Sequence, residues 1–223
     1  MLEQWLLKDE ARNVVCAVAG ERPGAHFGAA ARNDARSALQ GGEKSATPQA
    51  RFVGLITLGT AHRLNGEWDD AVRVLGDALD AAISGANRMI EGWLRSELAK
   101  ALLGRGERDR AEQEAQAAVV ISRAQHSRYE ELRGALALAQ VLLGHPDALA
   151  MARIDETLAS AQALIDETGA LAFQAELHEC RARLAMQRGD KKTAAALFEL
   201  ALKQYDDIGA PLQVARLQKE LGA

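Results

Sequence analysis

The sequence has few cysteines, prolines and aromatic residues. Among 223 residues there are 2 cysteines and 4 prolines, and Phe, Trp and Tyr together make up 4%. The cysteines, Cys16 and Cys180, lie far apart in apolar stretches, which favours two buried thiols over a disulfide or a reactive pair. The shortage of aromatics disfavours a β-sandwich. Alanine, about a fifth of the chain, instead favours helices packed closely through small side chains.

Long apolar runs and an excess of positive charge are also missing. No stretch approaches the roughly 18 apolar residues of a membrane-spanning helix. The start, MLEQWLLKDEAR, lacks the basic residues, long apolar core and small-residue cleavage site of a signal peptide. The 27 basic and 31 acidic side chains are mixed and give a net charge of −4. Because nucleic-acid binding requires a clustered positive face, we expect no nucleic-acid partner. Because neither a membrane-spanning run nor a signal peptide is found, we expect no membrane partner and a cytoplasmic location.

Helical periodicity is the pattern that the chain does have. Apolar residues recur three and four apart, as in AVRVLGDALDAAI, where Val72, Leu75 and Leu79 share one helical face. No convincing run alternates with a period of two. The prolines, at positions 23, 48, 146 and 211, fall where helices would begin, a place that tolerates the missing N–H. We therefore predict an all-α chain.

A glycine followed by a polar or charged residue recurs at intervals of roughly 40 residues and predicts stacked helix–turn–helix units. These glycines are Gly20, Gly66, Gly106, Gly144 and Gly189. The predicted helix pairs are 2–19 and 23–40, 49–65 and 67–84, 86–105 and 107–125, 128–144 and 146–168, and 170–188 and 190–208. The chain is then one helical-repeat domain, 1–223, with units 1–40, 49–84, 86–125, 128–168 and 170–208, a flexible connection at 41–48 and a capping helix at 211–221.

The stretch NGEWDDAVRVL shows the chemistry of these turns. Gly66 suits the left-handed conformation that ends a helix, and the acids after it suit the positive end of the next helix dipole. These acids are Glu67, Asp69 and Asp70. Beside a tryptophan they also resemble a metal or substrate site, but the ligand spacing of a calcium-binding EF-hand loop is missing. Because the turns at Gly106 and Gly189 repeat the pattern, we favour a recurring hairpin, with Trp68 sealing the bend.

The repeat resembles the tetratricopeptide repeat, whose helix pairs carry small and large residues at fixed positions. Three units carry the match: Leu58, Gly59, Gly66, Ala71, Leu75 and Ala78; Leu98, Ala99, Gly106, Ala111, Ala115 and Ala118; and Ala182, Gly189, Ala194, Phe198 and Ala201. The resemblance implies a right-handed superhelix of about five antiparallel helix pairs, a TPR-like α-solenoid. In it, Gly59 and Ala71 would let the two helices of a pair approach closely.

A narrower resemblance comes from the C-terminal end, AAALFELALKQYDDIGAPLQVARLQKEL, and from the period near 40. Both are similar to the degenerate helical repeats that follow the ATPase module in large bacterial regulators. Such regulators include maltose-type transcription activators and some multidomain nucleotide cyclases. For a chain of that kind, the resemblance implies a domain that senses a small ligand.

Motifs that carry catalytic chemistry are not found in the sequence. The histidines form no i, i+4 pair, and no HExxH, CxxC, GxxxxGK[ST] or GxSxG motif occurs. In LHEC, His178, Glu179 and Cys180 are adjacent on a helix and point about 100° apart, so they cannot share one ion. We expect no catalytic residue, no metal and no cofactor.

The inner helices of such a superhelix line a concave surface, and the repeat assigns residues to it. The predicted contact residues are Ile56, Thr60, Arg63, Trp93, Ser96, Lys100, Glu179 and Arg183. For Trp93, ligand contact and packing are equally favoured. The mixture suits an extended peptide or an amphipathic helix with flanking charges. Chaperone-adaptor tetratricopeptide domains hold a terminal carboxylate with a Lys and Asn pair. This pair is absent here, so we do not expect binding to the acidic C-terminal tail of a chaperone.

The expected function is therefore a non-enzymatic scaffold that binds a peptide or partner protein in this groove, in a bacterial regulatory or assembly context. The alternative is a small-ligand sensor domain of a signalling or transcription regulator. A homodimer is also compatible with the sequence, because the alanine-rich first helix pair and the open end of an array both offer surfaces for self-association.

Overall fold

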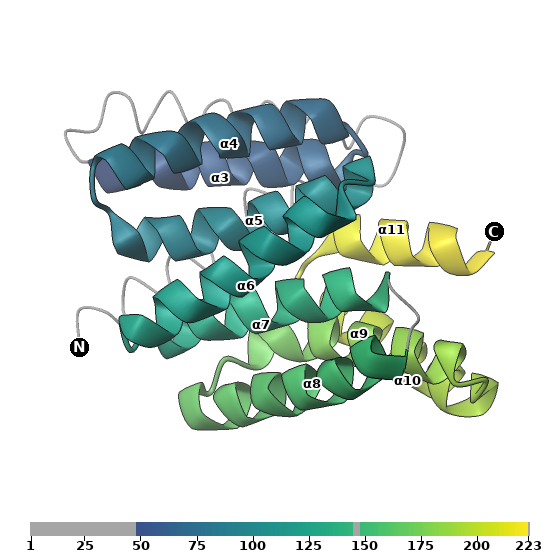
Figure 1. Cartoon of the computed structure of the whole chain (residues 1–223). Helices are drawn as coiled ribbons and strands as arrows, with labels where there is room; N and C mark the ends of the chain where they lie inside the picture. The colour runs from purple at the N-terminus through teal and green to yellow at the C-terminus, as the bar shows by residue number, and fades with distance from the viewer. Residues whose placement is uncertain (1–47, 145–147, 223) are drawn as a thin grey trace.

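The computed structural model describes residues 48–144 and 148–222, and within these ranges every regular element is a helix (Figure 1). The helices are α3 (Pro48–Leu64), α4 (Trp68–Ser84), α5 (Arg88–Arg105), α6 (Arg108–Ala124), α7 (Arg128–Leu143), α8 (Ala148–Thr168), α9 (Gln174–Gln187), α10 (Lys191–Asp207) and α11 (Pro211–Gly222), with a short 3-10 helix at Leu171–Phe173. The prediction of an all-α chain is confirmed for this part of the sequence.

The predicted helix ranges agree closely with the observed helices. The range 67–84, for example, corresponds to Trp68–Ser84. The exception is the predicted helix 170–188, which starts as the 3-10 helix and becomes α-helical only at Gln174. The predicted helices 2–19 and 23–40, with the connection before Pro48, lie outside the described residues.

The helices pack in sequence order as an α-solenoid. Each helix contacts the next one along the chain, and α3, α5, α7 and α9 also contact one another in succession. These four helices therefore form the inner layer, while α4, α6, α8 and α10 lie outside them (Figure 1). None of the helices in the described ranges is long and apolar enough to cross a membrane.

Small residues set the distance between the helices of a pair. Ala71 and Ala78 of α4 are fully buried, and so is Leu75 between them. Gly59 of α3 faces Leu75, because a Cβ added at Gly59 would lie only 2.5 Å from Leu75 Cγ. Gly59 thus makes room for Leu75, and the leucine fills the space between α3 and α4.

Trp68 packs on the neighbouring unit. It begins α4, and its ring lies against Gly104 near the end of α5, where an added Cβ would come within 2.3 Å of the ring. Trp68 therefore seals the junction between α4 and α5. The absence of a side chain at Gly104 is what allows this close contact.

Residues in the left-handed conformation end most of the helices. Gly66, Gly106 and Gly189 have φ angles of 75°, 88° and 79°, as predicted. Gly144 directly follows α7, where the repeat predicts a helix end, but its φ of −75° and ψ of −8° belong to the right-handed region. The structure adds two left-handed residues that are not glycine, Ala86 with φ of 51° and His126 with φ of 56°.

The turns at Ala86 and His126 have the hydrogen bonds of the glycine turns. The N–H of Asn87 donates to the Ala82 carbonyl at 2.9 Å, and the N–H of Ser127 donates to the Ser122 carbonyl at 3.0 Å. A residue with a side chain loses about 1–2 kcal/mol in this conformation. A search for glycine cannot find these turns, although they separate successive units in the same way.

Ala86→Gly and His126→Gly are each expected to raise the free energy of unfolding by about 0.5–1 kcal/mol. Glycine adopts a positive φ without strain, which outweighs its greater freedom in the unfolded chain. The reverse change, Gly106→Ala, should lower the free energy of unfolding by about 1 kcal/mol, because nothing but the backbone conformation opposes a side chain there. Urea unfolding followed by circular dichroism measures all three. If both glycine variants were less stable than the unaltered chain, the positive φ angles of Ala86 and His126 would not be strained.

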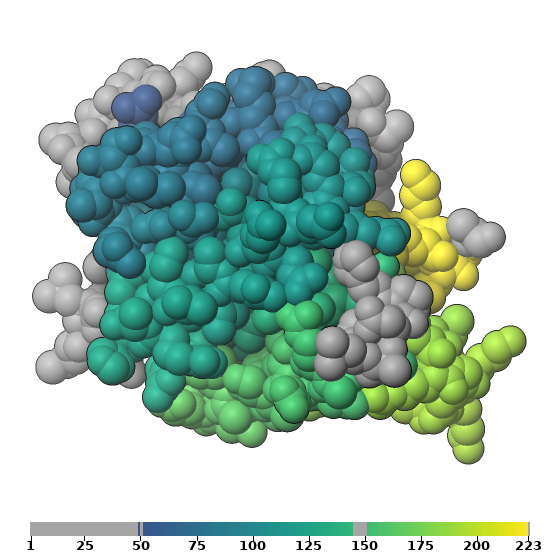
Figure 2. Space-filling model, viewed as in Figure 1, coloured from purple at the N-terminus to yellow at the C-terminus, as the bar shows by residue number. Residues whose placement is uncertain are grey.

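The C-terminal helix α11 returns to the first described helix. It packs on α10 and also contacts α3 (Figure 1). In the space-filling view it lies at the edge of the molecule, next to helices from much earlier in the sequence (Figure 2). The inner helices α3, α5, α7 and α9, together with α11, therefore surround a common space.

Candidate functional site

The concave side of the solenoid holds a cavity of about 650 Å³, lined mainly from α3, α5, α7, α9 and α11. Its apolar lining residues are Leu64, Trp68, Leu103, Leu143, Met186, Phe198, Leu217 and Leu221. Its polar and charged residues are Arg63, Lys100, Gln140, Glu176, Glu179, Arg183, Gln187, Tyr205, Gln213, Arg216 and Glu220. The cavity is thus neither uniformly apolar nor of one charge.

A buried carboxylate, Glu97 of α5, lies behind one wall of the cavity. It accepts a hydrogen bond from Thr60 Oγ1 at 3.2 Å and pairs with Arg63 Nη2 at 3.3 Å and Lys100 Nζ at 3.6 Å. Burial alone would raise the pKa of Glu97, but the charges of Lys100, Arg63 and Arg133 lower it to about 2. Glu97 therefore stays ionised and holds α3 against α5.

Lys100 extends this network to the C-terminal part of the chain. Its ammonium lies 2.6 Å from Glu176 Oε1 of α9, and Gln140 Nε2 of α7 donates to the same oxygen at 2.7 Å. Burial lowers the pKa of Lys100, but Glu176 and Glu97 more than offset it, so the net direction is upward. Lys100 remains charged, and its ion pairs connect α5 to α9 across the concave side.

A second buried carboxylate, Glu179 of α9, anchors α11. Arg216 donates to both of its oxygens, at 2.7 and 3.0 Å, and Arg183 Nη2 donates to Oε1 at 2.9 Å. The Tyr205 hydroxyl donates to Oε2 at 3.0 Å. Burial alone would raise the pKa of Glu179, but the two guanidinium groups lower it to about 2. Arg183 also pairs with Glu220 of α11.

Three of the predicted contact residues do not face a partner. Ile56, Trp93 and Ser96 are only 1%, 5% and 0% exposed, and Ile56 and Trp93 belong to the hydrophobic core. The Ser96 hydroxyl donates to the carbonyl of Gly92 within its own helix. The prediction that these three contact a ligand is wrong for this arrangement, because adjacent inner helices pack together and cover them.

The other five predicted residues lie on or beside the cavity. Arg63, Lys100, Glu179 and Arg183 line it, and Thr60 is bonded to Glu97 behind it. Most of them are engaged in ion pairs with the protein itself, and the Lys100 side chain is only 8% exposed. Arg183, at 37% exposure, has the most surface available to a partner.

Trp93 is a packing residue. The Arg133 guanidinium lies over its ring, 4.4 Å from the centroid, and also over Tyr129 and Phe173 at 5.1 and 5.3 Å. A cation over aromatic faces is favourable, and more so when it is removed from water. The face that a ligand would use is therefore occupied by Arg133, and packing is the correct choice between the two interpretations of Trp93.

Some cavity residues are not apparent from the sequence. Gln140 meets Glu176 from 36 residues away, and Arg216 meets Glu179 from 37 residues away. No short motif links such positions. The sequence predicts only that the last helix caps the array. That this helix also lines the cavity follows from the folded structure.

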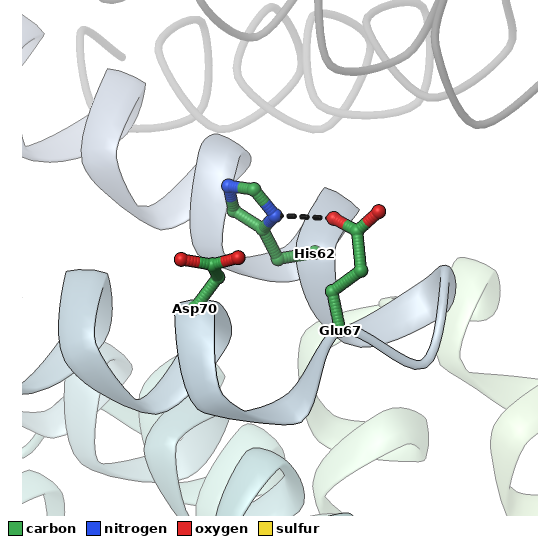
Figure 3. A group of neighbouring side chains, drawn as sticks. All are labelled: His62, Glu67 and Asp70. Atoms are coloured by element: carbon green, nitrogen blue, oxygen red, sulfur yellow. Dashed lines mark hydrogen bonds and ion pairs between the residues drawn. The ribbon is translucent and has the colours of Figure 1, made fainter.

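A separate group of possible metal ligands lies at the α3–α4 turn, where His62, Glu67 and Asp70 place ligand atoms within 4.8 Å of one another (Figure 3). The Glu67 carboxylate lies 2.6 Å from His62 Nδ1, and Arg73 donates to Asp70 at 2.9 Å. A cation would have to displace these bonds. We therefore assign the group to the structure of the turn.

Cys180 does not offer a reactive thiol. It is 1% exposed, and burial raises its pKa, as do the nearby Glu176 and Glu179 carboxylates. A thiol that stays protonated is a poor nucleophile. The expectation of a buried thiol is confirmed for Cys180, whereas Cys16 lies outside the described residues.

Comparisons with known proteins support the fold. No protein-family model matches the chain, and no curated protein matches it. Among solved structures, the chain is similar to a crystal structure of nearly identical TPR-like repeats from a kinesin light chain of Podospora anserina. The TM-score is 0.54 at 17% sequence identity, and the match covers 90% of this chain and 95% of that chain. At this identity the similarity shows a tetratricopeptide-like fold and nothing more specific.

Proposed function

We propose that the chain is a non-enzymatic scaffold that binds a segment of a partner protein in the concave cavity. The observation that supports this is the composition of the cavity wall, where apolar side chains alternate with paired charges. Arg183 is 37% exposed and Glu220 43%, and Met186, which also lines the cavity, is 50% exposed. Apolar anchors beside accessible charges of both signs suit a peptide with apolar and charged side chains.

The buried ion pairs hold the groove in shape and are unsuitable targets for testing binding. Replacing Arg63 or Lys100 by glutamate would place a second negative charge beside buried Glu97, so the fold itself would be damaged. A useful substitution has to change the groove surface and leave this network intact. Met186 of α9 meets that requirement, because it lines the cavity and is half exposed.

Met186→Glu is expected to weaken partner binding about tenfold with unchanged helical content, because it places a charge where an apolar anchor would be desolvated. The matched control is Leu200→Glu, on α10, which is 39% exposed and does not line the cavity. Binding is measured by calorimetry with a partner recovered from the native host by the unaltered chain and then purified. Equal affinity for the Met186→Glu and unaltered chains would exclude the groove as the binding surface.

A second candidate function is a small-ligand sensor within a larger regulator. It is favoured by the cavity volume of about 650 Å³, which falls within the roughly 300–1,000 Å³ of small-molecule sites. A ligand present at 100 times its Kd would stabilise the chain by about 2.7 kcal/mol and raise its melting temperature. A thermal-shift screen with a metabolite library tests this, and a flat response across the library argues for a macromolecular partner instead.

A further inference from the structure

The last helix, α11, lies where a bound partner helix would lie. It forms one wall of the concave cavity, to which it presents Gln213, Arg216, Leu217, Glu220 and Leu221. These positions are three and four residues apart and so share one face of the helix. α11 therefore has the pattern of an amphipathic helix whose recognition face points into the groove.

The surface under α11 complements that face in both charge and shape. We call this surface the α11 seat and define it by Glu179 and Arg183 of α9 and Phe198 and Tyr205 of α10. Arg216 makes a forked contact with Glu179, and one turn later Glu220 pairs with Arg183. Between them, Leu217 is fully buried in one hydrophobic cluster with Phe198 and Tyr205.

The fit of α11 in its own seat is incomplete. Gln213 Oε1 and Arg63 Nε, both of which belong to residues lining the cavity, are buried without a hydrogen-bond partner among the described residues. A buried polar group without a partner destabilises the arrangement that leaves it so. The end of α11 is also poorly covered, since Leu221 is 48% exposed. A different helix could satisfy these groups and bury more apolar surface.

α11 is also weakly held in place compared with the other described helices. It spans 12 residues, a length at which an isolated helix is marginal in water. Among the described helices it packs mainly on α10 and makes a smaller contact with α3. Local opening costs less for an element with few buried contacts than for one in the centre of the fold.

We propose that the partner is an amphipathic helix that displaces α11 and takes its seat. Its recognition face carries an arginine for Glu179, an apolar residue directly after that arginine, and an acidic residue four positions after the arginine for Arg183. The proposal rests on the proposed function and specifies its partner. α11 then acts as a resident occupant that keeps the seat closed until such a helix arrives.

The experiment uses the full chain and a fluorescent peptide with the sequence of residues 208–222, IGAPLQVARLQKELG. The tethered α11 competes with this peptide at an effective concentration on the order of millimolar. Arg216→Ala weakens the tethered helix and leaves the seat unchanged, so we expect the peptide to bind this variant about tenfold more tightly than the unaltered chain. Hydrogen exchange at residues 212–222 of the chain should become faster when the peptide binds.

Two controls keep the result interpretable. A peptide with Arg216→Glu and Glu220→Arg has the same composition and opposite charges, and it should bind at least tenfold more weakly because a carboxylate would face Glu179. If Arg216→Ala prevents folding, Glu220→Ala replaces it, since Glu220 is 43% exposed and its loss leaves no buried charge.

The outcomes separate this inference from the proposed function. Tighter binding to the variant with faster exchange in α11 supports displacement. Peptide binding without faster exchange overturns displacement and leaves groove binding in place. Equal affinity for both peptides, or no binding to a folded variant, overturns the assigned partner chemistry, whereas the proposed function itself stands or falls with Met186→Glu.

Discussion

Glu179→Ala is expected to lower the free energy of unfolding by about 3–5 kcal/mol. The carboxylate is 6% exposed and accepts hydrogen bonds from Arg216, Arg183 and the Tyr205 hydroxyl. Without it, the guanidinium groups of Arg183 and Arg216, whose side chains are 37% and 27% exposed, lose the buried carboxylate that they share. Urea unfolding followed by far-ultraviolet circular dichroism measures the loss, and hydrogen exchange should show α11 opening first, because Arg216 belongs to that helix.

Two further variants show whether the loss comes from uncompensated charge. Glu199→Ala removes an exposed carboxylate from α10 and should change stability by no more than about 0.5 kcal/mol. The double variant Glu179→Leu with Arg216→Leu removes both charges, so it should regain a large part of the stability that Glu179→Ala loses. A loss below about 1 kcal/mol for Glu179→Ala would mean that this network contributes little to the fold.

Features that depend on nearby residues were predictable from the sequence. The starts of α4 and α10 follow from apolar periodicity and from the glycine turns at Gly66 and Gly189, because each involves residues within one or two helical turns. Gly144 shows the limit of that logic, since a glycine is free to adopt an ordinary right-handed conformation when no left-handed turn is required. His126 shows the converse, because it adopts a positive φ in the same kind of hydrogen-bonded turn without being a glycine.

The cavity depended on contacts between distant parts of the chain. The repeat correctly places Arg63 and Lys100 on inner helices, but their ion pairs with Glu97 decide how much of them remains exposed. Lys100 meets Glu176 from 76 residues away, and no local pattern encodes that pairing. Ile56, likewise, was expected on an open concave face, and it is buried because the helices of neighbouring units close over it.

Acidification is expected to remove about 3 kcal/mol of stability through each of Glu97 and Glu179. Burial by itself would raise both pKa values, but the neighbouring cations lower each from 4.5 to about 2. A shift of this size on folding corresponds to about 3 kcal/mol per group. Because the folded carboxylates bind protons less readily than the unfolded ones, this stability is complete above pH 4.5 and is lost as the pH falls toward 2.

Glu97→Gln and Glu179→Gln provide the matched test of this pH dependence. Glutamine does not titrate and carries no charge. Each variant therefore lacks the ion pairs of the glutamate and should be less stable than the unaltered chain at pH 7. Between pH 5 and pH 2, each should then lose less stability than the unaltered chain, by about 3 kcal/mol. Urea unfolding at constant ionic strength across this range measures the difference. If both variants lose as much stability as the unaltered chain, the two carboxylates must bind protons with nearly ordinary pKa values in the folded state. Their cationic neighbours would then have to be more fully hydrated than the buried geometry of Lys100 and Arg216 allows, and the acid sensitivity would have to come from the exposed carboxylates of the outer helices.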